Sequence, residues 1–177
     1  EQYGFDFERG RLDTAAHPFC GGTHPGDIRM TTRFHEDLLT DALGSTMHES
    51  GHGMYEQGLP TDRIGEPVGE AVGLSIHESQ SRLWENQVGR SRAFWKRWEP
   101  RYRELFGEQL QSVSSEDLYR AVNKVGLTPI RVDADEVTYN LHIMIRFDLE
   151  KRLFSGNLQT KDLPEAWNEA STRILGY

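Results

Sequence analysis

The 177-residue sequence predicts a mainly helical fold with a small β-sheet beside the helices. Long segments place apolar residues every three or four positions, which is typical of amphipathic helices. The segment from Asp27 to Phe34 alternates apolar and polar side chains, which indicates a strand. The Gly- and Pro-rich residues 17–26 before it predict turns around further short strands. Because the length suffices for one hydrophobic core, we expect a single domain over residues 1–177.

Three helices are predicted after the strand. The first runs from about Glu36 to Gln57, and Gly58 is the residue type typical of a C′ position. A loop from Leu59 to Pro67 precedes a second helix, which is predicted from about Glu70 to Val88. A third is predicted from Arg90 to Phe106. Its aromatic and apolar residues at helical spacing are expected to pack in a core, and they are Phe94, Trp95, Trp98, Tyr102, Leu105 and Phe106.

The last third of the chain predicts three more helices and one strand. The first is a short helix over residues 114–122, which opens with a serine suited to the N-cap. Residues 128–132 predict a short strand, whose proline places it at a sheet edge or at the strand start. Asp135 is suited to cap a long helix over residues 136–154. Pro164 fits the first turn of the final helix.

The charge of the chain narrows the classes of partner. The formal net charge is −8 at pH 7, which argues against nucleic acid because proteins that bind it carry basic surfaces. No apolar run is long enough to span a bilayer, so no membrane partner is expected. The single cysteine, Cys20, cannot form an internal disulfide, and no secretory signal opens the chain. These observations favour a cytoplasmic protein.

The segment His48-Glu49-Ser50-Gly51-His52 has the pattern H-E-x-x-H. Residues four apart share one face of a helix, so His48 and His52 can direct a ring nitrogen at the same ion. Glu49 would lie close to that ion without binding it, as a general base for a water activated by Zn²⁺ requires. The alternative is a chance match, in which two exposed histidines bind nothing.

A catalytic zinc needs three protein ligands and an open position, so a third ligand must come from elsewhere. Glu78 is our candidate, because the second predicted helix can return antiparallel to the first. Glu70, Glu56 and His77 compete for this role. Adjacent residues on a helix point about 100° apart, so His77 and Glu78 are not expected to bind one ion together. The alternative for Glu78 is a solvated carboxylate on the helix surface.

Five motifs carry a resemblance to a known family. In order, they are His17-Pro18-Phe19, Asp27-Ile28-Arg29-Met30-Thr31, His48-Glu49-Ser50-Gly51-His52, His77-Glu78-Ser79-Gln80 and Ile130-Arg131-Val132-Asp133-Ala134-Asp135. With these motifs the chain resembles the carboxypeptidase Taq family of zinc metallocarboxypeptidases. The resemblance implies a helical zincin-like metallopeptidase with a deep groove. It also implies zinc or cobalt bound by His48, His52 and Glu78, with Glu49 as the catalytic residue, and a cytoplasmic homodimer.

The sequence departs from the family pattern in one respect. The motif G-x-x-Q-D-x-H-W, which the family carries further downstream, does not occur in these 177 residues. The helical region expected before the five motifs is not found either. We therefore expect residues 1–177 to be the catalytic region of a longer helical enzyme.

Three residues are candidates for binding a peptide substrate. Arg131 is the first choice to bind the free terminal carboxylate, because a planar guanidinium can bind a carboxylate through two hydrogen bonds. The resemblance implies the same role. Arg29 is the second choice, although an ion pair with Asp27 is the favoured alternative for it. His17 could donate a hydrogen bond to substrate near the metal, or it could fix the turn that Pro18 begins.

The leading hypothesis is a zinc-dependent metallocarboxypeptidase that hydrolyses the C-terminal peptide bond of peptides, with Glu49 as general base. One alternative is a zincin-type oligopeptidase, which would share the metal site but would not need to capture a terminal carboxylate. The other is a zinc-stabilised fragment without catalytic activity. A peptide with an amidated C-terminus separates the first two, because only the oligopeptidase should cleave it.

Overall fold

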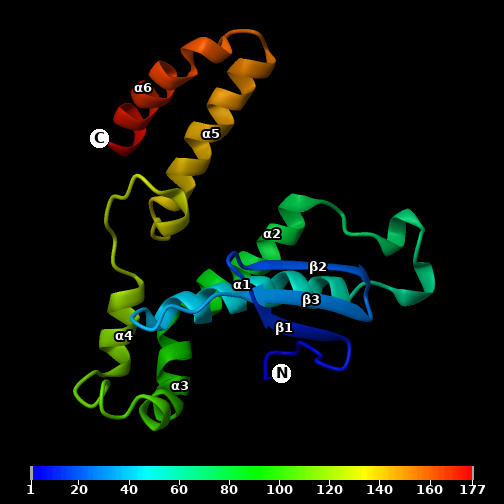
Figure 1. Cartoon of the computed structure of the whole chain (residues 1–177), viewed down its shortest axis with the longest axis vertical. Coiled ribbons are helices and arrows are strands. Elements are labelled where there is room, and N and C mark those ends of the chain that lie inside the picture. The colour runs from blue at the N-terminus through cyan, green and yellow to red at the C-terminus, as the bar shows by residue number, and fades with distance from the viewer. Residues whose placement is uncertain (1, 177) are drawn as a thin grey trace. The chain divides into compact units, whose positions relative to one another are not determined.

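The computed structural model describes residues 2–176, without the side chain of Leu39. The chain divides into two compact units, Glu1–Val122 and Asn123–Tyr177 (Figure 1). The first unit contains a three-stranded sheet and helices α1 to α4, and the second contains α5 and α6. The predicted fold class, mainly helical with a small sheet, is confirmed. None of the described helices is long and apolar enough to cross a membrane.

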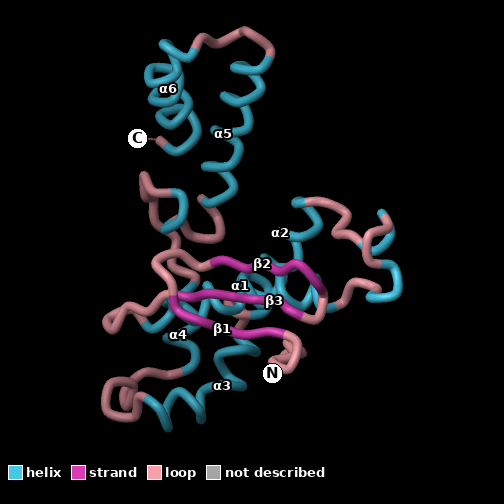
Figure 2. The backbone as a smooth tube through the Cα atoms, turned by 45° about the vertical axis from the view of Figure 1, so that its right-hand side comes forward, coloured by secondary structure: helices cyan, strands magenta, loops and turns pink. Residues whose placement is uncertain are grey.

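The sheet consists of β1 (Gly10–Thr14), β2 (Phe19–His24) and β3 (Asp27–Thr32), in the order β1-β3-β2 (Figure 2). The central strand β3 pairs parallel with β1 and antiparallel with β2. The predicted strand is therefore confirmed, although it ends at Thr32. Alternate residues of β3 are buried, among them Ile28 and Met30, which pack with Phe5 and with Met54 of α1. The alternation in the sequence reflects one face of β3 turned toward α1.

The two helices that carry the metal-site candidates begin later than predicted. Helix α1 (Leu39–Gln57) starts after Leu38, whose backbone angles are not helical (φ −129°, ψ 84°). Gly58 closes α1 as predicted, with right-handed backbone angles (φ −82°, ψ −9°). Helix α2 (Leu74–Arg82) cannot start at Glu70, because the backbone of Glu70 is extended (φ −102°, ψ 158°). A π-helical turn (Leu83–Val88) continues α2 to the predicted end. The intervening loop contains 3-10 turns at Thr61–Arg63 and Pro67–Gly69.

Helices α1 and α2 approach each other closely at Gly51. A Cβ atom there would lie 2.5 Å from the carbonyl oxygen of Gln80 and 2.5 Å from the Cα of Ser81. These are backbone atoms, so neither can rotate away. Glycine at this position of the H-E-x-x-H motif therefore lets the two helices bring their polar side chains together.

We expect Gly51→Ala to lower the free energy of unfolding by about 1–3 kcal/mol, because the added methyl group must push α2 away. Chemical denaturation of the two proteins measures the difference. Gly44→Ala is the matched control, because it lies in the same helix with nothing within 4 Å of its added Cβ. That control should be neutral or more stable by up to about 1 kcal/mol. Equal stability of the two variants would contradict the close approach.

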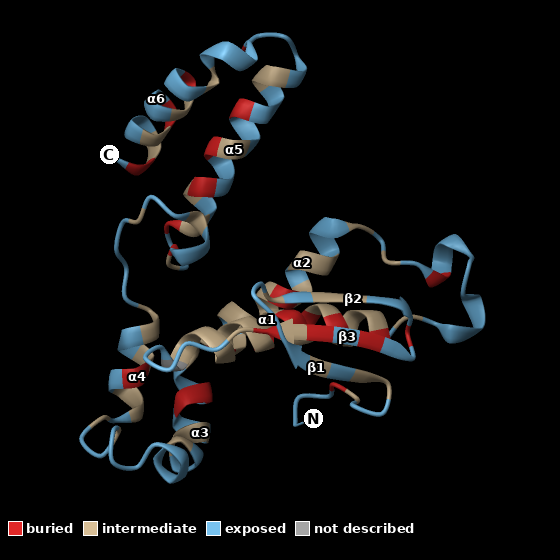
Figure 3. Ribbon diagram, viewed as in Figure 1, coloured by how far each residue is buried: buried red, intermediate tan, exposed pale blue. Residues whose placement is uncertain are grey.

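Helices α3 (Arg92–Leu105) and α4 (Ser115–Val122) complete the first unit. The Ser91 hydroxyl accepts a hydrogen bond from the N–H of Phe94 and caps α3. Trp95 is 1% exposed and packs with Phe94, Leu118 and Met47 of α1, which confirms the centre of the predicted aromatic stripe (Figure 3). The end of that stripe was predicted wrongly, because α3 ends at Leu105. Leu105 and Phe106 are exposed. The predicted cap of α4 is confirmed, as Ser114 and Asp117 exchange hydrogen bonds.

The second unit is a pair of helices, α5 (Tyr139–Phe154) and α6 (Leu163–Leu175), with Pro164 in the first turn of α6 as predicted. Figure 3 shows their buried residues along the facing sides of the pair. The core is formed by Ile145, Leu149, Leu158, Ala166, Ala170 and Leu175. The predicted strand at 128–132 is wrong. None of the described strands includes this segment, which reaches the 3-10 turn Arg131–Asp133 through the extended backbone of Ile130.

Asp135 caps the turn that leads into α5, which begins at Tyr139 rather than at residue 136. Its carboxylate accepts hydrogen bonds from the N–H groups of Val137 and Thr138 at 2.8 and 3.0 Å, and from the N–H of Gly126 at 3.1 Å. Burial acts to raise the pKa of this carboxyl, but the hydrogen bonds, first that from Thr138, outweigh burial and lower the pKa to about 2.

We expect Asp135→Ala to destabilise the protein by about 0.5–2 kcal/mol at pH 7, as the loss of a helix cap does. Because the folded pKa is lowered, this contribution is complete above the ordinary aspartate pKa and disappears as the pH falls from about 4 toward 2. Unfolding measured at pH 7 and at the lowest pH where the protein folds tests both points. Asp133→Ala, which removes a neighbouring exposed carboxylate, is the control and should have little effect. A difference from wild type that does not shrink in acid would contradict the role.

Candidate metal centre

Three side chains predicted to bind a metal converge between α1 and α2. His48 and His52 project from one face of α1, with their Nε2 atoms 3.2 Å apart. Glu78 comes from α2, and its Oε2 lies 3.4 Å from His52 Nε2 and 3.6 Å from His48 Nε2. Ligands of a tetrahedral zinc at bond lengths of about 2.0–2.1 Å are separated by about 3.3 Å. The observed donor set of two imidazole nitrogens and one carboxylate oxygen therefore fits such an ion in both chemistry and spacing.

A second layer of polar side chains holds two of these ligands in place. Glu85, in the π-helical turn, accepts a hydrogen bond from His48 Nδ1 at 2.8 Å, which leaves His48 Nε2 directed at the cluster. Arg82 donates to Glu85 at 3.0 Å and to Glu78 Oε1 at 3.0 Å. Carboxylates placed behind metal-binding histidines fix ring orientation and increase basicity. Glu85 was not predicted, although its spacing of seven residues from Glu78 places both on one face of a helix.

The competing ligands lie outside the cluster. His77 Nδ1 is 2.6 Å from His52 Nδ1, and His77 Nε2 is 2.6 Å from Glu56 Oε1. His77 therefore contacts the Nδ1 side of His52 rather than the Nε2 side that faces the cluster, and Glu56 contacts His77. Glu70 is exposed. The expectation that His77 and Glu78 do not face one point together agrees with this arrangement.

The charges of the cluster favour ionised ligands and a less acidic Glu49. Burial acts to raise the pKa of Glu78, but the hydrogen bond with His52 and the nearby His48 and Arg82 outweigh it and lower the pKa to about 2. Glu49 follows His48 on α1, is 7% exposed, and contributes no atom to the group of ligand atoms. Burial raises the pKa of the Glu49 carboxyl, while His48 and His52 oppose this change. A buried carboxylate with a raised pKa is a better proton acceptor than a solvated one.

The candidates for substrate binding are in three different settings. Arg29 is engaged by Asp27 through two hydrogen bonds of 3.0 and 2.9 Å, so the structure supports the favoured alternative of an ion pair. His17 is exposed, and its Nδ1 lies 2.5 Å from the carbonyl oxygen of Pro18, as expected for a residue that fixes a turn. Arg131 belongs to the second unit, where its Nη1 donates to the hydroxyl of Tyr139 at 2.5 Å.

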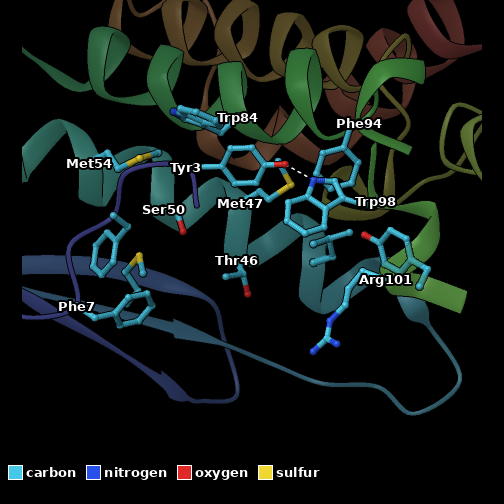
Figure 4. Close-up of a pocket in the computed structure, with 14 residues that line it drawn as sticks. Tyr3, Phe7, Thr46, Met47, Ser50, Met54, Trp84, Phe94, Trp98 and Arg101 are labelled. Carbon is cyan, nitrogen blue, oxygen red and sulfur yellow. Dashed lines mark hydrogen bonds between the residues drawn. The ribbon is translucent and has the colours of Figure 1, made fainter. Parts of the chain in front are cut away.

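A separate apolar cavity of about 300 Å³ lies between the N-terminal segment, α1, and α3 (Figure 4). Tyr3 lies between Trp84 and Trp98 in the cavity, and its hydroxyl accepts a hydrogen bond from the indole N–H of Trp98. No His, Cys, Asp or Glu lines it. The cavity therefore offers no metal ligand and no general base, and the chemistry is assigned to the histidine cluster.

Comparison with known proteins gives a consistent result. The family model of carboxypeptidase Taq (M32) metallopeptidases matches residues 1–177. Thermostable carboxypeptidase 1 of Thermus thermophilus is 56% identical over 173 residues, which cover 98% of this chain and 34% of that protein. Carboxypeptidase 1 of Bacillus subtilis is 40% identical over 176 residues, covering 99% of this chain and 35% of that protein. The chain therefore spans about a third of the length of these relatives.

A solved structure agrees with these sequence relatives. The M32 carboxypeptidase from Deinococcus radiodurans R1 superposes with a TM-score of 0.95 at 51% identity, covering 99% of this chain and 35% of that one. The family match includes every residue of the sequence, and the convergence of His48, His52 and Glu78 is what a metallopeptidase requires. The family indicated by the five motifs is thus confirmed: the chain belongs to the carboxypeptidase Taq (M32) metallopeptidases.

Proposed function

We propose that this chain is the catalytic region of a zinc-dependent metallocarboxypeptidase that removes the C-terminal residue of peptides. The observation that carries the proposal is the donor set of His48, His52 and Glu78 with the buried Glu49 beside it. Membership of a metallopeptidase family supports the same function. We propose that both compact units belong to this one catalytic region.

The mechanism assigns one task to each side chain of the site. His48, His52 and Glu78 would hold a divalent ion, which would supply Lewis-acid chemistry to the site. Glu49 takes a proton from the attacking water and then gives a proton to the leaving amine. Burial keeps the Glu49 carboxylate away from bulk water, which favours proton transfer to it.

Zinc is the proposed ion, and Co²⁺ can occupy the same donor set because selectivity for divalent ions depends mainly on geometry and availability. Two further proposals follow from the family resemblance: the working protein is a homodimer, and it is cytoplasmic. Light scattering of the purified protein tests the first, and fractionation of cells tests the second. The proposed partners are peptides with a free C-terminus.

The deciding experiment uses a protein that contains this chain and has measurable peptidase activity. It is loaded with one equivalent of zinc and given matched peptides with free and amidated C-termini. A carboxypeptidase releases single residues from the free peptide and leaves the amidated one intact. Cleavage of both peptides would favour the oligopeptidase, and zinc binding without turnover would favour the zinc-stabilised fragment.

A further inference from the structure

Arg82 lies between two carboxylates of the segment that supplies Glu78. Its Nε donates to Glu78 Oε1 at 3.0 Å, and its Nη1 donates to Glu85 Oε2 at 3.0 Å. The three residues follow one another at helical spacing, because Glu78 precedes Arg82 by four positions and Glu85 follows it by three. The side chains of Arg82 and Glu85 are only 27% and 18% exposed, so water competes little for the hydrogen bond between them.

The two oxygens of the Glu78 carboxylate face different partners. Oε2 lies 3.4 Å from His52 Nε2 and 3.6 Å from His48 Nε2, close to the spacing of ligands of one tetrahedral ion. It also accepts a hydrogen bond from Ser81 Oγ at 3.1 Å. Oε1 accepts the hydrogen bond from Arg82. A guanidinium holds its N–H groups in a rigid plane, so Arg82 fixes the direction in which Oε1 points.

This division of the two oxygens has a consequence for the number of ligands. A carboxylate can bind a metal ion through one oxygen or through both. A catalytic zinc has three protein ligands and keeps a further position open for water or substrate. If Glu78 supplied both oxygens, the second oxygen would compete for that position. A hydrogen bond that engages Oε1 therefore favours binding through Oε2 alone.

We propose that Arg82 is a positioning residue, which engages Oε1 of Glu78 so that only Oε2 is presented to the metal. The inference rests on the proposed function in taking His48, His52 and Glu78 as the metal site. Arginine suits this task because its charge persists at every pH at which proteins fold. Its second hydrogen bond, to Glu85, holds the guanidinium in place beside Glu78.

The first test measures the visible absorption of Co²⁺ bound at one equivalent to an active protein that contains this chain. Four-coordinate Co²⁺ absorbs more strongly than five- or six-coordinate Co²⁺, and wild type should show the strong bands. Arg82→Met keeps the apolar stem but frees Oε1, so the absorption should fall as Glu78 supplies a second oxygen. Arg82→Lys should recover part of the loss, because one ammonium cannot reproduce the fork that engages both carboxylates.

Two controls separate this role from a general loosening of the site. Arg120→Met removes an arginine that forms the same i,i+4 ion pair, with Glu116 on α4, and should leave the spectrum unchanged. Glu85→Gln alters the side chain behind His48 but keeps the hydrogen bond from Arg82 to Glu78. It should therefore weaken Co²⁺ binding about 10–100-fold, as the loss of residues behind a metal ligand does, while the bands of a four-coordinate ion remain at saturation.

The second test repeats Arg82→Met in a Glu78→Gln background at saturating Co²⁺. The glutamine amide has only one oxygen, so the loss of Arg82 should not lower the absorption further. Such non-additivity would assign the effect of Arg82 to the second oxygen of Glu78. X-ray absorption of the zinc-loaded proteins checks the same point, because it counts the nitrogen and oxygen neighbours of the ion. Arg82→Met should have one neighbour more than wild type.

Two results would overturn the proposal. One is a wild-type spectrum in Arg82→Met, saturated with Co²⁺ and shown by circular dichroism to be folded; Arg82→Lys carries the same comparison if Arg82→Met does not fold. The other is an equal loss of absorption in the Glu78→Gln and wild-type backgrounds, which would mean that Arg82 only supports the packing of α2. Failure of the proposed function has a different signature: wild type would show the bands of four-coordinate Co²⁺ and yet leave peptides with a free C-terminus intact.

Discussion

Glu49→Gln is expected to lower kcat by about 10²–10⁴-fold in an active protein that contains this chain, with zinc affinity retained. The amide has nearly the same shape as the carboxylate, but it cannot accept the proton of the attacking water. Zinc should remain because Glu49 contributes no atom to the group formed by His48, His52 and Glu78. Steady-state kinetics on a peptide with a free C-terminus, together with metal analysis of the same sample, measure both quantities.

The matched control for this substitution is Glu70→Gln, which makes the same chemical change at an exposed carboxylate outside the cluster. Its kcat and zinc content should equal those of wild type. Loss of zinc from the Glu49 variant would mean that the carboxylate binds the metal. Wild-type activity with zinc retained would mean that another group accepts the proton.

The part of the site that could be predicted from sequence is the part that one helix determines. The spacing of His48 and His52 alone places both rings on one side of α1. The identity of the third ligand could not be settled that way, because it depends on how α2 lies against α1. That packing is governed by the close approach at Gly51, where backbone atoms of Gln80 and Ser81 leave no space for a side chain. The expected return of the second helix made Glu78 the candidate with competitors still open, and the family resemblance strengthened that choice.

Glu85 was not predicted because its contact with His48 also depends on how the helices pack against each other. The spacing of seven residues from Glu78 could indicate that Glu85 shares its helical face, but not that Glu85 contacts His48 on another helix. The wrong strand at 128–132 illustrates the point for the fold. An extended, apolar segment forms a strand only when a neighbour pairs with it, and neighbours are a property of the tertiary structure. By contrast, the Arg29 ion pair involves residues two apart, and sequence alone favoured it correctly.

Arg131 is expected to make the enzyme an exopeptidase by binding the terminal carboxylate of the substrate. The positive charges of Arg131 and Arg146 favour binding of an anion beside Arg131. The pKa of Arg146 is lowered by burial and then by the positive charge of Arg131, so an arriving carboxylate would relieve repulsion between the two guanidinium groups. The hydrogen bond from Arg131 to the Tyr139 hydroxyl, together with the ring of that tyrosine beneath the guanidinium, orients its planar group.

Arg131→Ala should therefore lower kcat/KM for peptides with a free C-terminus by about 10–100-fold, which corresponds to the roughly 1.5–3 kcal/mol of a hydrogen bond to a charged group. Zinc affinity should be unaffected. Arg131→Lys should rescue only part of the loss, because an ammonium cannot reproduce two parallel hydrogen bonds. Arg29→Ala is the matched control and should keep wild-type selectivity, because Asp27 already engages that guanidinium. The measurement is kcat/KM on paired free and amidated peptides; equal losses on both would show that Arg131 supports the fold of its unit rather than the recognition of a carboxylate.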